Sequence, residues 1–189
     1  MKTLNKILIL AMMAVVLVSC KKEEEKDYTL KDITPLITTY SGNCTIFTLD
    51  FSEKKEKTQS TNVEFLKTND AKALVLKTDE FGIIIEPLIK NFKTSEDGNY
   101  YTFSLDGFNQ SWSEAQVPLY IKEWLGGAFK KITSVTAKMQ PTNGKYDTVT
   151  NTVTFTYDAE TTVVGTNAGD ESRSQKIIVK YQYAVTKKN

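Results

Sequence analysis

Apolar and polar residues alternate with a period of two along most of the chain from Tyr40 onward. The alternation is clearest over residues 100–105, 152–157 and 177–185, where aromatic and β-branched side chains take every second position. Successive side chains of a β-strand point to opposite faces, so this period predicts antiparallel strands with one face in a core.

Further segments are short but rich in β-branched or aromatic residues, which favour strands. They cover residues 43–51, 62–67, 72–78 and 133–139. The continuous apolar segment Phe81–Ile85, followed closely by Pro87, predicts an eighth strand that is covered on both faces. We therefore expect an all-β fold of about eight strands, arranged as an antiparallel barrel or a sandwich.

Glycine, asparagine and proline mark the expected connections between these strands. Glu96–Asn99 and Pro141–Gly144 contain residues that adopt positive φ easily, so tight hairpin turns are predicted there. Residues 160–174 contain two glycines and an asparagine, and we expect them to form a long exposed loop between the last two strands.

One segment departs from the strand pattern. Residues 118–125 begin with proline, place Tyr120 over Trp124 at i, i+4 spacing, and are followed by two glycines. These features predict a short helix. Such a helix would plug a barrel end or cover an open sheet edge.

The amino terminus has the layout of a signal peptide over residues 1–19. Its apolar stretch of about 12 residues would span roughly 18 Å as a helix, short of the ~30 Å of a bilayer core, so a transmembrane helix is disfavoured. The sequence Leu17-Val18-Ser19-Cys20 resembles the lipobox of bacterial lipoproteins. This resemblance implies that Cys20 becomes the mature terminus and carries a lipid that anchors the protein to a membrane. The alternative is a cleaved signal whose cysteine is incidental.

Residues 20–34 follow as an expected flexible tether, because they begin with a charged run of lysines and acidic residues without apolar anchors. Residues 35–189 suit a single β-rich domain. The acidic cluster resembles the export signal of lipoproteins in Bacteroides-type bacteria, although an ordinary spacer is equally compatible. Together, the lipobox, tether and β-rich domain resemble the small cell-surface lipoproteins of these bacteria, including calycin-like (lipocalin-like) barrels. The resemblance implies an outer-membrane location, on the cell surface or the periplasmic face.

Composition excludes several kinds of chemistry. The formal net charge is +1 and Arg173 is the only arginine, which argues against nucleic-acid binding. The chain has no histidine, which excludes histidine-dependent nucleophiles and the usual zinc or copper sites. Chemistry that uses carboxylates alone stays open. Cys44 is expected to be an inert thiol, since no basic neighbour lowers its pKa. We predict a non-enzymatic protein without a cofactor or a metal.

Four aromatic residues lie within 17 positions and are the candidate ligand-binding residues: Phe108, Trp112, Tyr120 and Trp124. Large rings can stack on sugars or line the mouth of a ligand pocket. The alternative is that they belong to the core. Trp112, with serine on both sides, is expected in a polar loop and is the better binding candidate, whereas Trp124 is expected to pack inward.

Asp147-Thr148-Val149 is similar to an O-glycosylation signal of the same bacteria, which implies modification at Thr148 in a turn. For the function as a whole, two hypotheses follow. One is a binding module for a glycan or a small apolar ligand. The other is a structural or partner-binding subunit of an envelope complex. An internal apolar cavity would favour the first, and a filled core with an exposed apolar patch would favour the second.

Overall fold

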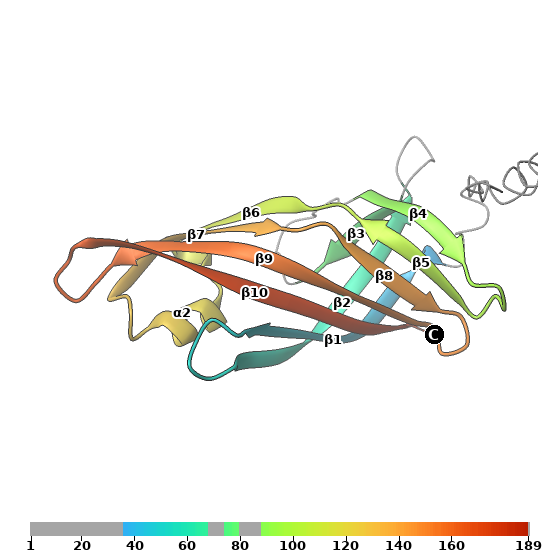
Figure 1. Ribbon diagram of the computed structural model, residues 1–189, viewed down its shortest axis with the longest axis horizontal. Coiled ribbons are helices and arrows are strands. Elements are labelled where there is room, and N and C mark those ends of the chain that lie inside the picture. The colour runs from blue at the N-terminus through green and yellow to red at the C-terminus, as the bar shows by residue number, and fades with distance from the viewer. Residues whose placement is uncertain (1–35, 68–73, 80–87, 189) are drawn as a thin grey trace, which may run out of the picture.

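A computed structural model describes residues 36–67, 74–79 and 88–188, which form a curled antiparallel sheet and one short α-helix (Figure 1). The predicted signal peptide, Cys20 and the tether lie outside these residues, and so does the strand expected at Phe81–Ile85. The described strands are β1 Thr39–Thr48, β2 Lys55–Lys67, β3 Leu74–Thr78, β4 Leu88–Thr94, β5 Tyr100–Leu105, β6 Phe108–Ser113, β7 Lys131–Met139, β8 Thr142–Asp147, β9 Thr152–Thr166 and β10 Ser172–Lys187.

Eight of these strands pair in a ring. The order is β10-β1-β2-β3-β4-β5-β8-β9, and β9 pairs again with β10, always antiparallel. The sheet therefore curls back on itself into a barrel-like shape. This confirms the predicted all-β architecture of about eight antiparallel strands.

The other two strands, β6 and β7, lie outside the ring. β9 has 15 residues, which is roughly 50 Å at about 3.4 Å per residue, long enough for two partners in succession. Its first half pairs with β8, through Phe155 and Gly144, and its second half pairs with β7, through Ala159 and Met139. β6, β7 and the distal halves of β9 and β10 thus form a four-stranded extension beyond the ring, at the left in Figure 1.

The interior is filled by one continuous cluster of apolar and aromatic side chains. Burial alternates along β9 and β10 as the sequence pattern predicts, so one face of each strand belongs to the core. Aromatic rings pack directly on one another inside the ring; Phe155 and Tyr183, for example, stack with centroids 4.4 Å apart.

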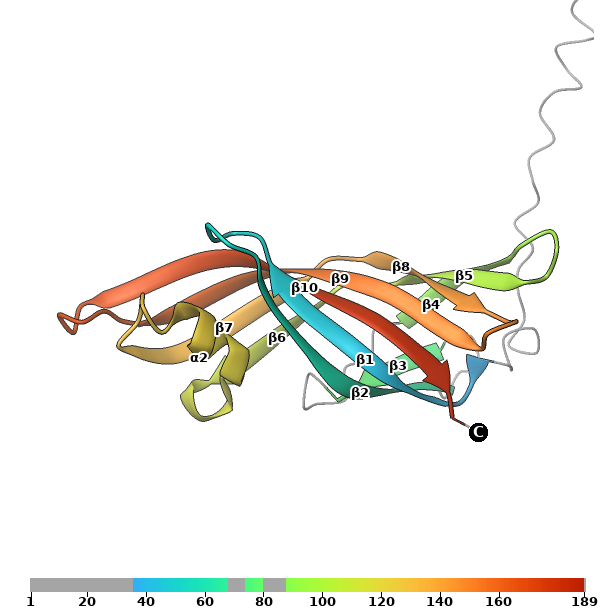
Figure 2. The same cartoon turned by 90° about the horizontal axis from the view of Figure 1, so that it is seen from below.

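The predicted helix is present as α2, Leu119–Leu125, with Pro118 at its N-cap and Gly126 at its C-cap. It follows a single 3-10 turn, Glu114–Gln116, and lies against the extension (Figure 2). The hydroxyl oxygens of Tyr120 and Tyr181 lie 2.6 Å apart and share a buried hydrogen bond, which ties the helix to β10. Within the described part of the chain, we find no helix of the length and apolarity that a membrane crossing needs.

The long loop expected at residues 160–174 is wrong. Strands β9 and β10 continue to Thr166 and from Ser172, and only residues 167–171 form the connection. The side-chain oxygen of Asn167 accepts hydrogen bonds from the backbone N–H groups of Gly169 and Glu171, at 2.9 and 3.0 Å, and so closes the turn. The glycine at position 165 is not a loop residue, because it sits buried on β9, where Lys131 and Phe129 leave no room for a Cβ.

The hairpin turn expected at Pro141–Gly144 is also wrong. Asn143 and Gly144 lie inside β8, which pairs with β5 and β9. A Cβ at position 144 would collide with the ring of Phe103, so this glycine serves close packing and not a turn. The turn at Glu96–Asn99 does contain the expected positive φ, at Gly98.

Candidate functional site

The four candidate aromatic residues lie on β6 and α2, and all of them pack toward the core. Trp112 is not in a polar loop: it is on β6 with 8% exposure, because β6 buries every second residue. Phe108, four residues earlier on the same face, packs edge-on against Tyr157 with centroids 5.3 Å apart. The structure therefore reverses the expected order of exposure, since Trp124 is only half-buried.

Tyr120 and Trp124 are the two candidates that the structure brings into direct contact, with ring centroids 5.1 Å apart on α2. Tyr120 is buried against Tyr181, and Trp124 packs at the edge of the core. The four rings together form part of the packing between the helix and the sheet. They do not present an open stacking platform on the described surface.

Thr148 lies in the turn between β8 and β9 and is half-buried. Its hydroxyl donates to the backbone oxygens of Gly98 and Asn99, at 3.2 and 2.9 Å, which joins this turn to the β4–β5 turn. The carboxylate of Asp147 accepts the N–H groups of Thr150 and Val149, and these bonds hold the pKa of Asp147 below its usual range. Modification at Thr148 stays a prediction, and a sugar there would replace two hydrogen bonds.

A shallow depression of about 530 Å³ lies on the outer face of the extension, across β6, β7, β9 and β10. We call it the outer-face depression. Its floor is the backbone around a row of inward-facing residues that pair across the four strands, Gln110, Ala137, Thr161 and Ile177. The side chains on either side of this row point away from the core, because strand side chains alternate.

Uncharged polar side chains from three strands line this depression: Asn109 and Ser111 on β6, Thr136 on β7, and Thr162 on β9. Ser111, Thr136 and Thr162 are direct cross-strand neighbours. None of the four side chains hydrogen-bonds to another described residue. On the ring, by contrast, outward polar side chains pair across strands, as in Thr45–Thr58, Ser41–Asn62 and Ser104–Asn143. The outer-face depression thus holds a set of uncommitted donors and acceptors.

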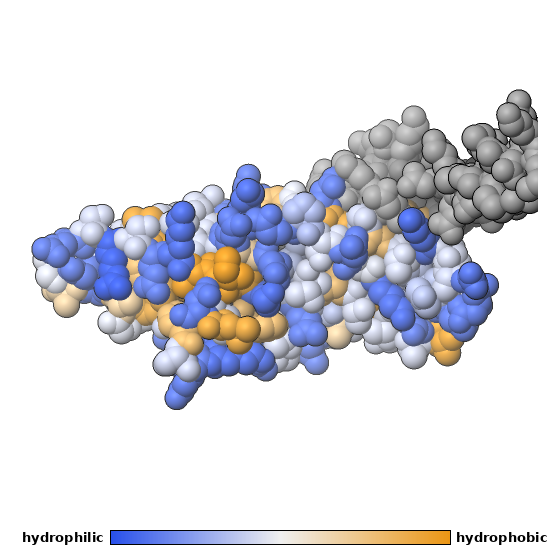
Figure 3. Space-filling view, in the orientation of Figure 1, coloured by the Kyte–Doolittle hydropathy of each residue, from blue (hydrophilic) through white to orange (hydrophobic). Residues whose placement is uncertain are grey.

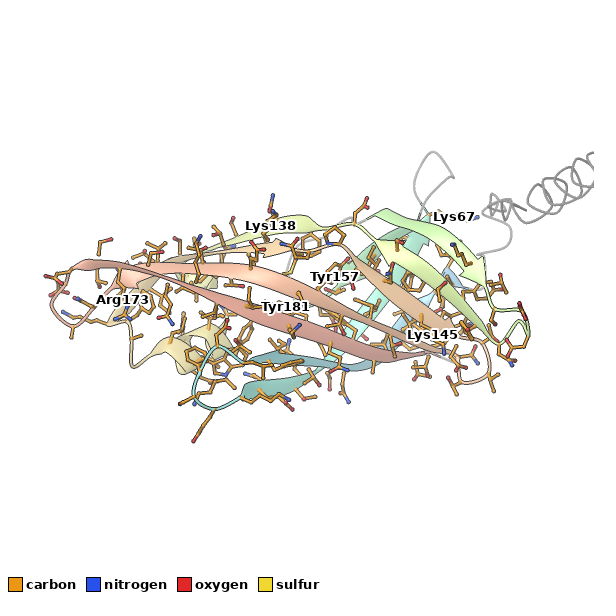
Figure 4. All side chains as sticks on the ribbon, in the orientation of Figure 1. Lys67, Lys138, Lys145, Tyr157, Arg173 and Tyr181 are labelled. Carbon is orange, nitrogen blue, oxygen red and sulfur yellow. The ribbon has the colours of Figure 1, made fainter. Side chains whose placement is uncertain are left out.

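Charged side chains border the same depression. Lys138 on β7 projects outward from the sheet (Figure 4), and Lys176 lies on β10. Neither ammonium group forms an ion pair with a residue that the structure describes. Glu160 lies between them on β9 and accepts a hydrogen bond from the side-chain amide of Gln140 at 3.0 Å.

These groups limit the chemistry of the depression. Glu160 is the only carboxylate among its lining residues, and the two-carboxylate mechanism of glycosidases needs a pair. The described residues contain no group of three or more aspartate, glutamate, histidine or cysteine side chains that could hold a metal ion. Cys44 is a buried thiol on β1, opposite Tyr183. What the depression offers is hydrogen bonding and positive charge on a hydrogen-bonded sheet.

Sequence reasoning missed this depression, although Asn109 and the alternating serines were visible beside Trp112. The sequence signal was weak, because the inward-facing Gln110 is polar and hides the alternation of Phe108 and Trp112 with Asn109 and Ser111. Comparison with known proteins adds no assignment: no family model, no curated protein and no solved structure matches the chain.

Proposed function

We propose that this protein is a lipid-anchored, non-enzymatic binding module that holds a hydrophilic ligand of the glycan class in the outer-face depression. The observation that carries the proposal is a set of amide and hydroxyl groups that have no partner among the described residues: the exposed Asn109, Ser111 and Thr136, and the half-buried Thr162. Polar groups fixed on strands and free to bond outward suit a ligand that presents many hydroxyls.

A glycan fits better than a small apolar ligand, which was the other possibility for a binding module. An apolar ligand needs an apolar cavity, and the interior between the ring strands is occupied by side chains such as Phe103, Tyr157 and Tyr183. The outer-face depression is open to solvent and bordered by lysines, and Ile178 is the one large apolar side chain exposed among its lining residues, so a ligand there would contact polar groups as well as apolar surface.

The proposed anchor agrees with the placement of the depression. The first described strand, β1, begins at the ring end of the molecule, and the β9–β10 turn lies at the opposite end (Figures 1 and 2). A lipid on Cys20, joined through the polar tether, would hold the ring end nearer the membrane. The extension would then point away from the bilayer, toward soluble or cell-bound polysaccharide.

The first prediction concerns the hydroxyl of Thr162. In full-length protein purified in detergent, Thr162→Val should weaken glycan binding about two- to twelve-fold, because a lost hydrogen bond costs about 0.5–1.5 kcal/mol. The measurement is a glycan-array screen followed by titration of the best ligand. Thr154→Val is the matched control, since it changes an exposed threonine of the same strand on the ring and should leave affinity unchanged. Equal effects of the two variants would refute the site, and an empty array would refute the function.

The alternative, a partner-binding subunit of an envelope complex, is favoured by one specific observation. Leu49 and Ile178 are 63% and 40% exposed, and Figure 3 shows adjacent hydrophobic areas over β10 and the β1–β2 connection. A stoichiometric partner that co-purifies from membranes and is lost with Leu49→Asp, but not with Val149→Asp, would support this alternative. Val149 is equally apolar and 71% exposed, but it lies in the β8–β9 turn at the ring.

A further inference from the structure

Two lysines from different strands border the outer-face depression, and their charges are not used inside the described part of the protein. Lys138 is directly opposite Glu160 in the ladder, yet no ion pair joins them among the described contacts. Elsewhere on the same sheet, lysines are paired: Lys180 bonds both carboxylate oxygens of Asp158, at 2.8 and 2.7 Å. The depression is therefore a place on this sheet where two ammonium groups are left for a ligand.

The spacing of the two ammonium groups is set by the strands. Lys138 and Lys176 are two strands apart and displaced by two residues along the sheet, which places their Cα atoms about 12 Å apart. Thr162 lies between them, next to Lys176 in the ladder. Flexible lysine side chains can therefore both reach a group that lies over Thr162.

The single carboxylate of the depression does not cancel this charge. The lining residues carry two lysines and Glu160, so the depression has a net positive charge at neutral pH. One oxygen of Glu160 is also engaged by the Gln140 amide. The chain as a whole has a formal net charge of only +1, so an anion would be drawn by this local arrangement and not by the overall field.

We infer that the outer-face depression selects acidic glycans, whose carboxylate or sulfate groups bind Lys138 and Lys176 while their hydroxyls bond to the threonines, Ser111 and Asn109. The inference rests on the proposed function and specifies its ligand class. Charge-assisted hydrogen bonds to an ammonium group are stronger than neutral ones, so the acidic group would dominate selectivity.

The main comparison is between two polymers with the same sugar backbone, one with free carboxylates and one with methyl esters. Binding of the full-length protein in detergent is measured for polygalacturonate and for its methyl-esterified form, with heparin and hyaluronate as further acidic polymers. We expect polygalacturonate to bind at least ten-fold more tightly than the ester. The preference should shrink as salt rises from about 20 to 300 mM, because salt screens exposed charges.

Two variants assign the effect to the depression. Lys138→Gln and Lys176→Gln should each weaken acidic-polymer binding about two- to five-fold. Lys145→Gln is the matched control, since Lys145 is an exposed lysine on β8 that packs over the ring of Tyr100. Its affinity should not change.

The outcomes separate the inference from the function on which it rests. Equal affinity for charged and esterified polymers would overturn the inference and leave glycan binding intact. Equal losses from Lys145→Gln and Lys138→Gln would show unspecific attraction and would also overturn it. Binding to none of these acidic polymers, together with capture of a neutral glycan on an array, would refute the charge selectivity alone; capture of no glycan at all would refute the proposed function too.

Discussion

Single residues decide which side chains fit between neighbouring strands of this sheet. Gly144 on β8 faces the ring of Phe103 on β5, and the two strands are hydrogen-bonded neighbours. Because both positions are in the ladder, neither backbone can move away without breaking cross-strand bonds. The space that a methyl group would need is filled by an aromatic ring whose own surroundings include Phe65 and Phe92.

Gly144→Ala should therefore destabilise the protein by about 1–3 kcal/mol, the usual cost of overpacking a core. The measurement is the free energy of unfolding in urea. Gly127→Ala, which places a methyl group where nothing lies within 4 Å, is the control and should change stability by less than about 0.5 kcal/mol. A Gly144 variant as stable as the wild type would mean that Phe103 can rotate out of the way.

The side chain of Asp50 marks the end of the hydrogen-bonded ladder between β1 and β10. β1 pairs with β10 as far as Phe47 and Lys180, and beyond this point the N–H of Ile178 donates to the carboxylate of Asp50. The side chain takes the place of the next strand residue and blocks part of an edge that could pair with another chain.

At the scale of elements, α2 is a short helix whose stability comes from packing. A helix of seven residues is not stable alone in water, so its contacts with the extension hold it in place. The buried hydrogen bond between Tyr120 and Tyr181 is the polar part of that contact, and Ile121 and Leu125 supply the apolar part.

Tyr120→Phe should loosen this helix without unfolding the ring. The loss of one buried hydrogen bond costs about 1 kcal/mol and leaves Tyr181 with one polar contact fewer. Amide hydrogen exchange should speed up several-fold in α2 and in the facing part of β10, and stay unchanged in β1 and β2. Leu119→Ala, on the exposed side of the same helix, is the control. Uniform changes across all strands would contradict a local role.

Two turns at the ring end depend on ionised carboxylates. Asp97 accepts hydrogen bonds from the Ser95 hydroxyl and the Asn99 backbone, and these bonds lower the pKa of Asp97. The pKa of Asp147 is lowered in the same way in the neighbouring turn. A carboxyl group whose folded pKa lies below its unfolded value stabilises the fold above that unfolded value, about 3.9, and the contribution is lost as pH falls through the folded pKa.

We therefore expect these turns to open first in acid. Carboxyl carbon shifts should titrate with midpoints below about 3.9 for both residues, and exchange protection of the turn amides should fall below that midpoint while the ring strands stay protected. Midpoints at or above the unfolded value would contradict the assigned hydrogen bonds.

The element scale also explains what the sequence could predict. Strands such as β10 were predictable because Val179, Tyr181 and Tyr183 alternate with polar residues without a break. β6 was not, because one of its inward positions is Gln110, which is buried with only 6% exposure yet counts as polar in any pattern. The end of β9 was mistaken for a loop for a related reason, since Thr161 and Gly165 face inward there. Where polar or small residues face inward, the two-residue alternation of apolar and polar positions is lost, and predictions of strands depend on that alternation.

At the scale of the whole molecule, the candidate site could not be predicted from the sequence for a different reason. Its side chains come from four strands that span residues 109–178, and they meet only because β7 and β8 share β9 end to end. Strand order and register decide that Thr136 lies beside Thr162, and alternation within each strand carries no information about either. The all-β class was predictable from the local sequence pattern. Which residues become cross-strand neighbours was not.

The closed ring of strands has a consequence for when the chain can fold. Tyr40 on the first described strand pairs with Lys187 on the last, so the barrel-like sheet cannot close until nearly the whole chain is available. Contacts of such long sequence separation make folding slow, on the order of milliseconds to seconds. During synthesis from the amino terminus, β1 therefore lacks its β10 partner until the last described strand has emerged.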